Sequence, residues 1–250
     1  MVSDITALRW KLHGPRGPSR SQTLLLAEAS RAAIIASGSR QGLARWPDSF
    51  HGPASGGAHD HAHWLPADRD GDGWIDHLLL FAPSGIPLEL LPLLCGCHRV
   101  FFERGLEWEL RPVWMGIPPP DGIFSTALVW RTVTPYVTPR RVRRAAGGER
   151  AALSPEGQMR WELQQRGWPM PTKVKCLPDQ PHEDLASSFV VTTRTRRAPP
   201  YAVRSFAEVV FPHAVRGPLT LGFGAHFGLG LFAPQRPLTK ELQLAPRHTV

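Results

Sequence analysis

The stretch Gly217-Pro218-Leu219-Thr220-Leu221-Gly222-Phe223-Gly224-Ala225-His226-Phe227-Gly228-Leu229-Gly230-Leu231-Phe232 decides how the C-terminal part of the chain folds. Its last four glycines alternate with apolar residues, and apolar strand segments carry so many glycines only where the backbone bends or approaches another segment closely. A glycine-rich loop of this kind can also present backbone N–H groups to phosphate oxygens. We therefore expect a tight, glycine-shaped loop that is able to bind phosphate.

The size and charge of the chain bound its class. It has 250 residues, of which 42% are hydrophobic, which is enough for one large domain or two of ordinary size. It holds 29 Lys and Arg against 21 Asp and Glu, a formal net charge of +8. This excess favours a polyanionic partner such as nucleic acid, although a solvated basic surface is the alternative.

Cysteine usage and hydropathy indicate the compartment. The three cysteines, Cys95, Cys97 and Cys176, are odd in number, and the Cys-x-Cys pair lacks the second pair that a zinc ribbon needs. We expect a reducing environment. The first residues resemble no signal peptide, and the longest apolar run, 86–94, is broken by two prolines and is too short to span a bilayer. The sequence therefore predicts a cytoplasmic protein.

The first half of the chain predicts one ferredoxin-like unit. Alternating apolar residues predict strands over 7–12, 61–65, 75–81 and 108–114, and helical patterns predict helices over 23–36, stopping at Gly38, and over 88–104. The resulting order is β-α-β-β-α-β, which is the order of the ferredoxin-like fold.

The second half predicts a degraded copy of the same unit. Ser154 and Pro155 begin a helix that runs to about Arg166 and is followed by Gly167. Strands are predicted over 127–136, 171–177, 189–194 and 202–211, before the glycine-rich run. The predicted fold class is therefore α+β, with tandem ferredoxin-like (RRM-like) units over 1–116, which holds a His-rich strand, and 123–250, which holds the glycine-rich loop.

A histidine cluster is the first candidate for catalysis. His59, His61 and His63 alternate, so on a strand they lie on one face. Imidazole moves protons near neutral pH, and RNA cleavage by its own 2′-hydroxyl needs one base and one acid. Two neighbouring histidines can supply both without a metal ion. The alternatives are a structural His-rich strand and a metal-binding face.

An aspartate-rich segment, Asp68–Asp76, resembles the start of a calcium loop. Its carboxylates fall at loop positions 1, 3, 5 and 9, but position 12 is Leu79 in place of the bidentate glutamate. We therefore expect a tight turn held by Asx hydrogen bonds, and we assign no metal ligands and no cofactor.

Basic and glycine-rich loops are the candidates for binding an RNA backbone. Arginine forks match phosphate oxygens, and two arginine clusters lie in predicted loops of the second unit. The predicted RNA-binding residues are Arg140, Arg141, Arg143, Arg144, Arg194, Arg196, Arg197, Gly222, Gly224, His226, Gly228 and Gly230.

These motifs together resemble a known family. The segment 59–77, with its His59-x-His61, its Asp-Gly-Asp-Gly and its Asp76-His77, resembles the type I-U/I-G CRISPR-associated fusion subunit, in which a Cas-five-like domain precedes a Cas-six-like endoribonuclease. The segments 160–171, 194–200 and 215–232 are similar to the same family. The resemblance runs through most of the chain, from Leu8 to Pro234.

The resemblance implies a metal-independent endoribonuclease that cleaves CRISPR repeat RNA to mature crRNA. Attack by the 2′-hydroxyl would leave a cyclic phosphate or 3′-phosphate and a 5′-hydroxyl. His61 would be the lead catalytic residue and His59 its partner. Implied partners are the repeat RNA or crRNA and other interference-complex subunits, including a Cas-five-like protein.

Two departures from the family pattern are visible. The Cas-five-like half is absent from this sequence, which predicts a stand-alone domain, a split protein or a fragment. Residue 63 is a histidine, His63, where the family pattern has an aromatic residue. His13 is a rival catalytic histidine, because such a residue often lies near the first strand or helix of Cas-six-like proteins.

Two other functions fit parts of the sequence. A non-catalytic subunit that binds crRNA needs the same basic and glycine-rich surfaces but no histidine chemistry. A metal-dependent hydrolase would use the histidine cluster together with the carboxylates of Asp68–Asp76, and we rank it last because the calcium pattern is incomplete.

Overall fold

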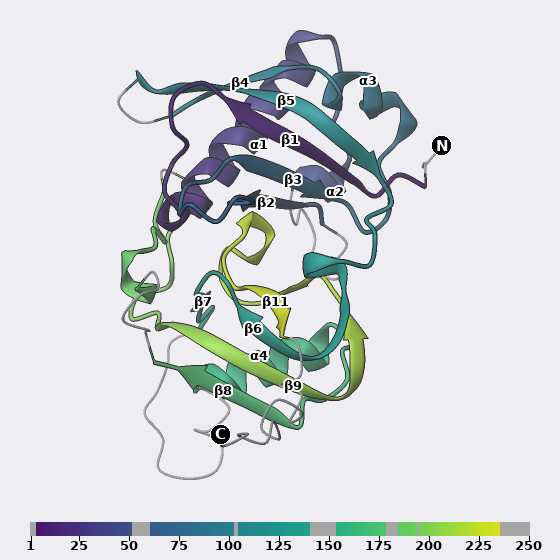
Figure 1. The fold of residues 1–250 in the computed structure, drawn as a ribbon. Helices are drawn as coiled ribbons and strands as arrows, with labels where there is room; N and C mark the ends of the chain where they lie inside the picture. Colours follow the sequence, from purple (N-terminus) through teal and green to yellow (C-terminus); the bar gives the residue numbers. More distant parts are fainter. Residues whose placement is uncertain are drawn as a thin grey trace, which may run out of the picture.

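A computed structural model describes residues 4–51, 61–102, 105–140, 154–178, 185–193 and 195–235. Two antiparallel sheets lie next to each other, and the glycine-rich turn projects from the second sheet toward strand β2 of the first (Figure 1). No helix in these ranges is both long and apolar enough to cross a membrane.

The first sheet has the strand order β2-β3-β1-β5-β4. Its strands are β1 (Ala7–His13), β2 (His63–Ala67), β3 (His77–Phe81), β4 (His98–Phe101) and β5 (Glu107–Gly116). The helix α1 (Thr23–Arg40) packs on one face and contacts β2 and β4. The other face is turned away from α1.

The second sheet has the order β10-β11-β6-β9-β7, and β8 also pairs with β9. Its strands are β6 (Thr126–Thr132), β7 (Tyr136–Val137), β8 (Lys173–Leu177), β9 (Arg204–Arg216), β10 (Leu219–Thr220) and β11 (Leu231–Gln235). The helix α4 (Pro155–Gln165) packs against β8.

Both sheets contain the ferredoxin-like strand order. In the first, β5-β1-β3-β2 reads 4-1-3-2, and in the second β11-β6-β9-β8 reads the same way. In the second unit, β10 and the glycine-rich turn take the place of the second helix. The predicted α+β class with tandem ferredoxin-like units is therefore confirmed. The predicted division at 116 and 123 stays a prediction, and one hydrophobic core joins residues of both halves, such as Leu80 and Phe227.

The remaining helical segments are short. They are α2 (Asp48–His51), α3 (Leu91–Leu94) and the 3₁₀ turns η1 (Arg20–Gln22), η2 (Leu88–Leu90), η4 (Gly122–Phe124), η6 (Ala186–Ser188) and η7 (Ala225–Phe227).

The helix predicted over 88–104 is wrong. The segment forms η2, then α3, and then the strand β4. Two prolines restrict the first turns, and from His98 to Phe101 burial alternates with a period of two, which is the period of a strand. The apolar run therefore supplies a short helix and the extra edge strand of the first sheet.

Other predicted boundaries also differ. The helix α1 passes through Gly38 to Arg40, because this glycine serves close packing: a Cβ there would lie 2.7 Å from the indole of Trp46. The strand predicted over 189–194 is wrong, and in the described part of it only an isolated bridge joins Thr192 to Arg197. The guanidinium of Arg204 binds the carbonyl oxygens of Ser187 and Phe189 there, so this segment follows side-chain hydrogen bonds.

The signals predicted for α4 are confirmed. The Ser154 Oγ accepts a hydrogen bond from the backbone N–H of Gly157 at 3.0 Å, with Pro155 at the first helical position. Gly167 follows the helix with φ +70°, a conformation that favours glycine.

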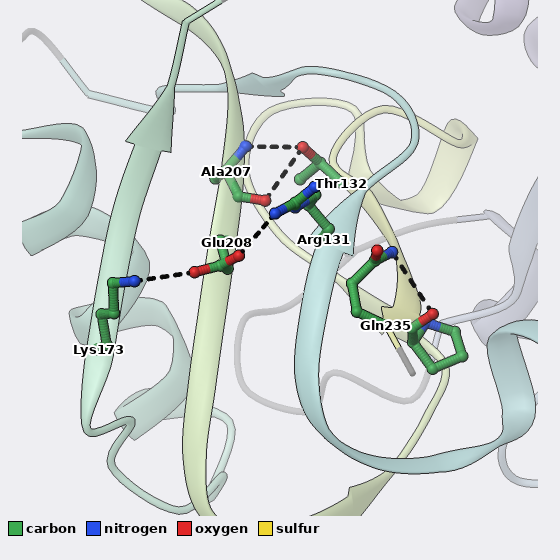
Figure 2. Close-up of polar contacts among 7 residues, drawn as sticks. Arg131, Thr132, Lys173, Ala207, Glu208 and Gln235 are labelled. Atoms are coloured by element: carbon green, nitrogen blue, oxygen red, sulfur yellow. Dashed lines mark hydrogen bonds and ion pairs between the residues drawn. The ribbon is translucent and has the colours of Figure 1, made fainter. Parts of the chain in front are cut away.

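Polar side chains link the strands in the middle of the second sheet. Figure 2 shows the carboxylate of Glu208 on β9 between Lys173 of β8 and Arg131 of β6, each at 3.0 Å. The Thr132 Oγ1 accepts the N–H of Ala207 at 2.7 Å. The ion pairs with Lys173 and Arg131 lower the pKa of Glu208. These contacts tie β6, β8 and β9 together independently of the backbone ladder.

The glycine-rich run closes into a compact turn between β10 and β11. Gly222, Gly224, Gly228 and Gly230 all have positive φ, between +57° and +88°. At Gly230 a Cβ atom would fall on the carbonyl oxygen of Leu221. The turn therefore requires glycine both for its left-handed backbone and for this close approach.

Substitution of Gly230 tests this account of the turn. We expect Gly230→Ala to lower the free energy of unfolding by more than about 3 kcal/mol, because left-handed strain and a backbone clash add together. The control is Gly42→Ala, which has φ +85° and open space around the site, and it should cost only about 1–2 kcal/mol. Urea unfolding measures both, and equal costs would contradict the close-packing argument.

Candidate functional site

Three imidazoles meet where the glycine-rich turn contacts the edge strand β2. The ring of His226 in η7 lies 4.4 Å from the ring of His63 and 5.7 Å, edge to face, from that of His61, centroid to centroid. The alternation predicted for the histidine strand therefore places His61 and His63 beside the same partner. His59 lies outside the described residues, so its role stays a prediction.

A cavity of about 100 Å³ borders this cluster. His61 and His226 line it together with Arg31 of α1 and Arg196 from the segment before β9. Phe50 and Phe227 are among the apolar residues of its wall. Two imidazoles and two guanidiniums thus face one small space, a composition suited to an anion.

Arg31 was not among the site residues predicted from the sequence. Its one sequence signal is the spacing to Glu28, which puts the two side chains on one face of α1. Glu28 forms an ion pair with Arg196 at 2.6 Å, and Arg196 lines the cavity, so this face of α1 lies beside the cavity. Burial lowers the pKa of Arg31, and the neighbouring Arg196 lowers it further while Glu28 opposes this.

Arg196 is held in place on two sides. Besides its ion pair with Glu28, its guanidinium lies over the ring of Phe227, 4.2 Å from the centroid. The Phe227 ring belongs to η7, so Arg196 connects α1 with the glycine-rich turn. Two guanidiniums against one carboxylate leave the cavity wall with an excess of positive charge.

His63 differs from the other two histidines. It is 7% exposed, and burial lowers its pKa to about 4, with a further contribution from the positive charge of Arg166. Its ring also packs against Phe81. His63 is therefore a neutral packing residue at physiological pH, and His61 and His226 remain as the cavity's histidines.

A buried carboxylate anchors the start of the glycine-rich turn. Glu162 of α4 accepts hydrogen bonds from the Tyr136 hydroxyl at 2.9 Å and from the Gly222 N–H at 2.8 Å, and pairs with Arg166 at 3.2 Å. Arg166 also donates to the carbonyl of Thr220 at 2.5 Å. Burial raises the pKa of Glu162 and lowers that of Arg166, and each partner opposes the shift in the other.

The backbone N–H groups of three glycines in the turn are already hydrogen-bonded within the protein. Hydrogen bonds from the N–H groups of Gly222, Gly228 and Gly230 go to Glu162, Ala225 and Pro135 respectively. These three glycines therefore do not offer the free N–H groups that the sequence analysis expected for phosphate. Their assignment to RNA binding stays a prediction.

The predicted arginines separate in the structure. Arg196 lines the cavity, whereas Arg140 lies over the Trp161 ring of α4 at 3.9 Å and Arg197 is exposed. The others lie outside the described residues: Arg141, Arg143, Arg144 and Arg194. Among the described arginines of the prediction, Arg196 alone reaches the histidines.

The aspartate segment forms the expected turn. Asp68 accepts the N–H groups of Gly71 and Gly73, and Asp72 accepts that of Trp74. Oxygens of Asp68, Asp70 and Asp72 lie within 4.8 Å of one another. Their hydrogen bonds to the backbone of the same segment account for this geometry.

Comparisons with known proteins give the following result. No protein-family model matches the chain, and no curated protein sequence matches it. Among solved structures, the chain is similar to a RAMP protein described as binding different RNA substrates, with TM-score 0.42, 11% identity, and coverage of 93% of this chain and 99% of that chain. It is also similar to Thermus thermophilus Cse3 bound to an RNA representing a pre-cleavage complex, with TM-score 0.35, 12% identity and coverage of 92% and 98%.

The pKa of His63 predicts a pH dependence of stability. The unfolded chain takes up a proton near pH 6.5, but the folded protein does so only near pH 4. The free energy of unfolding should therefore fall by about 3 kcal/mol as the pH drops from 6.5 to 4, since one pH unit is worth about 1.4 kcal/mol.

Urea unfolding between pH 4 and 7.5 measures this fall in stability. His63→Phe keeps a ring in the site and should remove about 3 kcal/mol of the pH dependence. The exposed His213→Phe should leave the dependence unchanged. Parallel curves for wild type and His63→Phe would show that His63 is not buried in the neutral form.

Proposed function

We propose that the protein is a metal-independent endoribonuclease that cleaves CRISPR repeat RNA to mature crRNA, within or alongside an interference complex. The observation that supports it is the cavity where His61 and His226 face the guanidiniums of Arg31 and Arg196. The type I-U/I-G identity and the Cas-five-like partner rest on the sequence resemblance alone.

The cavity has the groups that such a reaction needs. A general base removes the proton of the 2′-hydroxyl, whose oxygen attacks the adjacent phosphorus. The bond from phosphorus to the 5′-oxygen breaks, and a general acid gives that oxygen a proton. The products are a 2′,3′-cyclic phosphate and a 5′-hydroxyl, and no water or metal ion enters the balance.

The roles follow from position. His61 and His226 border the same space, so one accepts and the other donates the proton. Arg31 and Arg196 stabilise the negative charge that grows on the phosphate oxygens. His63 does not exchange protons, since it is buried and neutral. His59 stays a predicted catalytic residue.

The rival His13 lies far from this cavity. His13 is the last residue of β1 and pairs with Glu109 of β5. Ala7, at the other end of β1, pairs with Phe81, and Phe81 pairs in turn with His63. Six residues of strand separate the two rows, roughly 20 Å. His13 and the cavity histidines therefore cannot act on one phosphate.

Cleavage of end-labelled repeat RNA in EDTA tests the proposal. We expect one discrete cut by the wild type, and a rate lower by about 10²–10⁴-fold in His61→Ala and in His226→Ala. Arg31→Ala should lower the rate by about 10²-fold through lost charge stabilisation. The controls are the exposed His213→Ala and the rival His13→Ala, both with wild-type rates.

Each other outcome has a meaning. Normal cleavage by both His61→Ala and His226→Ala would reject the assigned histidines. Cleavage that EDTA abolishes would favour the metal-dependent hydrolase. Tight, salt-sensitive binding without a product at any pH from 6 to 8 would favour a non-catalytic crRNA-binding subunit.

A further inference from the structure

A second, larger cavity lies on the face of the first sheet that is turned away from α1. Its volume is about 390 Å³. The sheet contributes Leu65, Leu79, Arg9 and Trp114, and the segment between the two sheets covers it with residues that include Asp121. We call this cavity the sheet cleft.

The floor of the sheet cleft is one row of paired residues. Leu65 of β2 is opposite Leu79 of β3, Leu79 is opposite Arg9 of β1, and Arg9 is opposite Trp114 of β5. Residues in register project to the same face of a sheet. The β1–β5 register shifts by a bulge next to Arg9, and the row ends in an indole ring beside a guanidinium.

Arg9 is the polar group at the centre of this row. Its guanidinium lies 5.9 Å from the centroid of the Trp114 ring. Its Nε atom is buried and has no hydrogen-bond partner. Arg69 also lines the cleft and adds a second positive charge, while Asp121 supplies a carboxylate. An unpaired buried donor is costly, and a ligand with an acceptor atom would satisfy it.

We propose that the sheet cleft binds a guanine base of the RNA whose scissile phosphate lies at the histidine cavity. This inference rests on the proposed function. An indole face stacks on any base, but guanine offers two acceptors, O6 and N7, to the fork of Arg9. Its N1–H and N2–H groups are donors for the carboxylate of Asp121.

Adenine does not match this pair of side chains. Its amino group would direct hydrogens at Arg9, and it has no N1–H for Asp121. The sheet cleft thus distinguishes the two purines by hydrogen bonding rather than by shape, and an unmatched buried donor carries the larger penalty.

The strand β2 connects the sheet cleft to the histidine cavity. His61, Ala62 and Trp64 line the cavity, and Leu65 and the two residues after it line the cleft. Four residues of extended chain separate His61 from Leu65, about 13 Å. The glycine-rich turn covers β2 between these two sites, so a single RNA strand that passes over the turn would occupy both. The next row continues the path with Lys11, opposite His77.

Binding of short uridine-rich RNA oligonucleotides tests the inference. Each carries one central guanine or adenine, a fluorescent label and 2′-O-methyl groups, so that none can be cut. We expect anisotropy titrations of the full-length wild type to show about tenfold tighter binding of the guanine oligonucleotide. Arg9→Ala and Asp121→Asn should reduce this preference to less than about twofold.

Conservative and control variants sharpen the test. Arg9→Lys keeps the charge but loses the fork, so it should lose the preference and keep most of the affinity. Arg99→Ala and Asp48→Asn remove exposed ion-paired charges away from the cleft and should keep the preference. Thermal unfolding of each variant verifies that it is folded.

Several results would overturn the inference. These are equal binding of the two oligonucleotides by the wild type, or an unchanged preference in a folded Arg9→Lys protein. Free GMP that binds as tightly as the guanine oligonucleotide would make the cleft a mononucleotide site. These oligonucleotides cannot be cut, so the binding test does not depend on nuclease activity. If the wild type fails to cleave repeat RNA but still prefers the guanine oligonucleotide, the proposed nuclease is rejected and the guanine site stands.

Discussion

The candidate site depends on the hydrogen-bond network around the buried carboxylate of Glu162. Glu162 is 7% exposed and receives hydrogen bonds from Tyr136 of β7, from Arg166 just after α4 and from Gly222, the first glycine of the turn. Removing one partner of such a buried pair typically costs about 3–5 kcal/mol, because the other charge is left unpaired. Since Arg166 also holds Thr220, this one network fixes where the chain leaves β10 and enters the glycine-rich turn.

The position of the turn then determines the chemistry around it. β2 is the edge strand of its sheet, and the turn covers that edge with His226 and Phe227. Gly228 packs so closely on Thr23 and Pro66 that a Cβ atom there would lie 2.8 Å from the threonine methyl group. The candidate site is thus composite: α1, β2, the turn and the segment of Arg196 each contribute one wall, and neither sheet forms it alone.

Local patterns in the sequence predicted the parts that depend on local physics. The cap and stop signals around α4 and the shared face of His61 and His63 are decided within a few residues. Arg31 was missed because only tertiary packing brings α1 to the histidines, and the N–H groups of the turn were misjudged because acceptors such as Pro135 are distant in the sequence. The apolar run at 88–104 does not by itself distinguish a helix from a strand. In the structure it forms two short helical turns followed by the strand β4.

The most direct test of the central claim is a crystal structure with repeat RNA that carries a 2′-deoxy nucleotide at the cut. The RNA then binds but cannot react. We expect the scissile phosphate to lie between Arg31 and Arg196, with the 2′-carbon and the 5′-oxygen facing His61 and His226. A scissile phosphate bound elsewhere, for example beside His13 at the far end of β1, would contradict it.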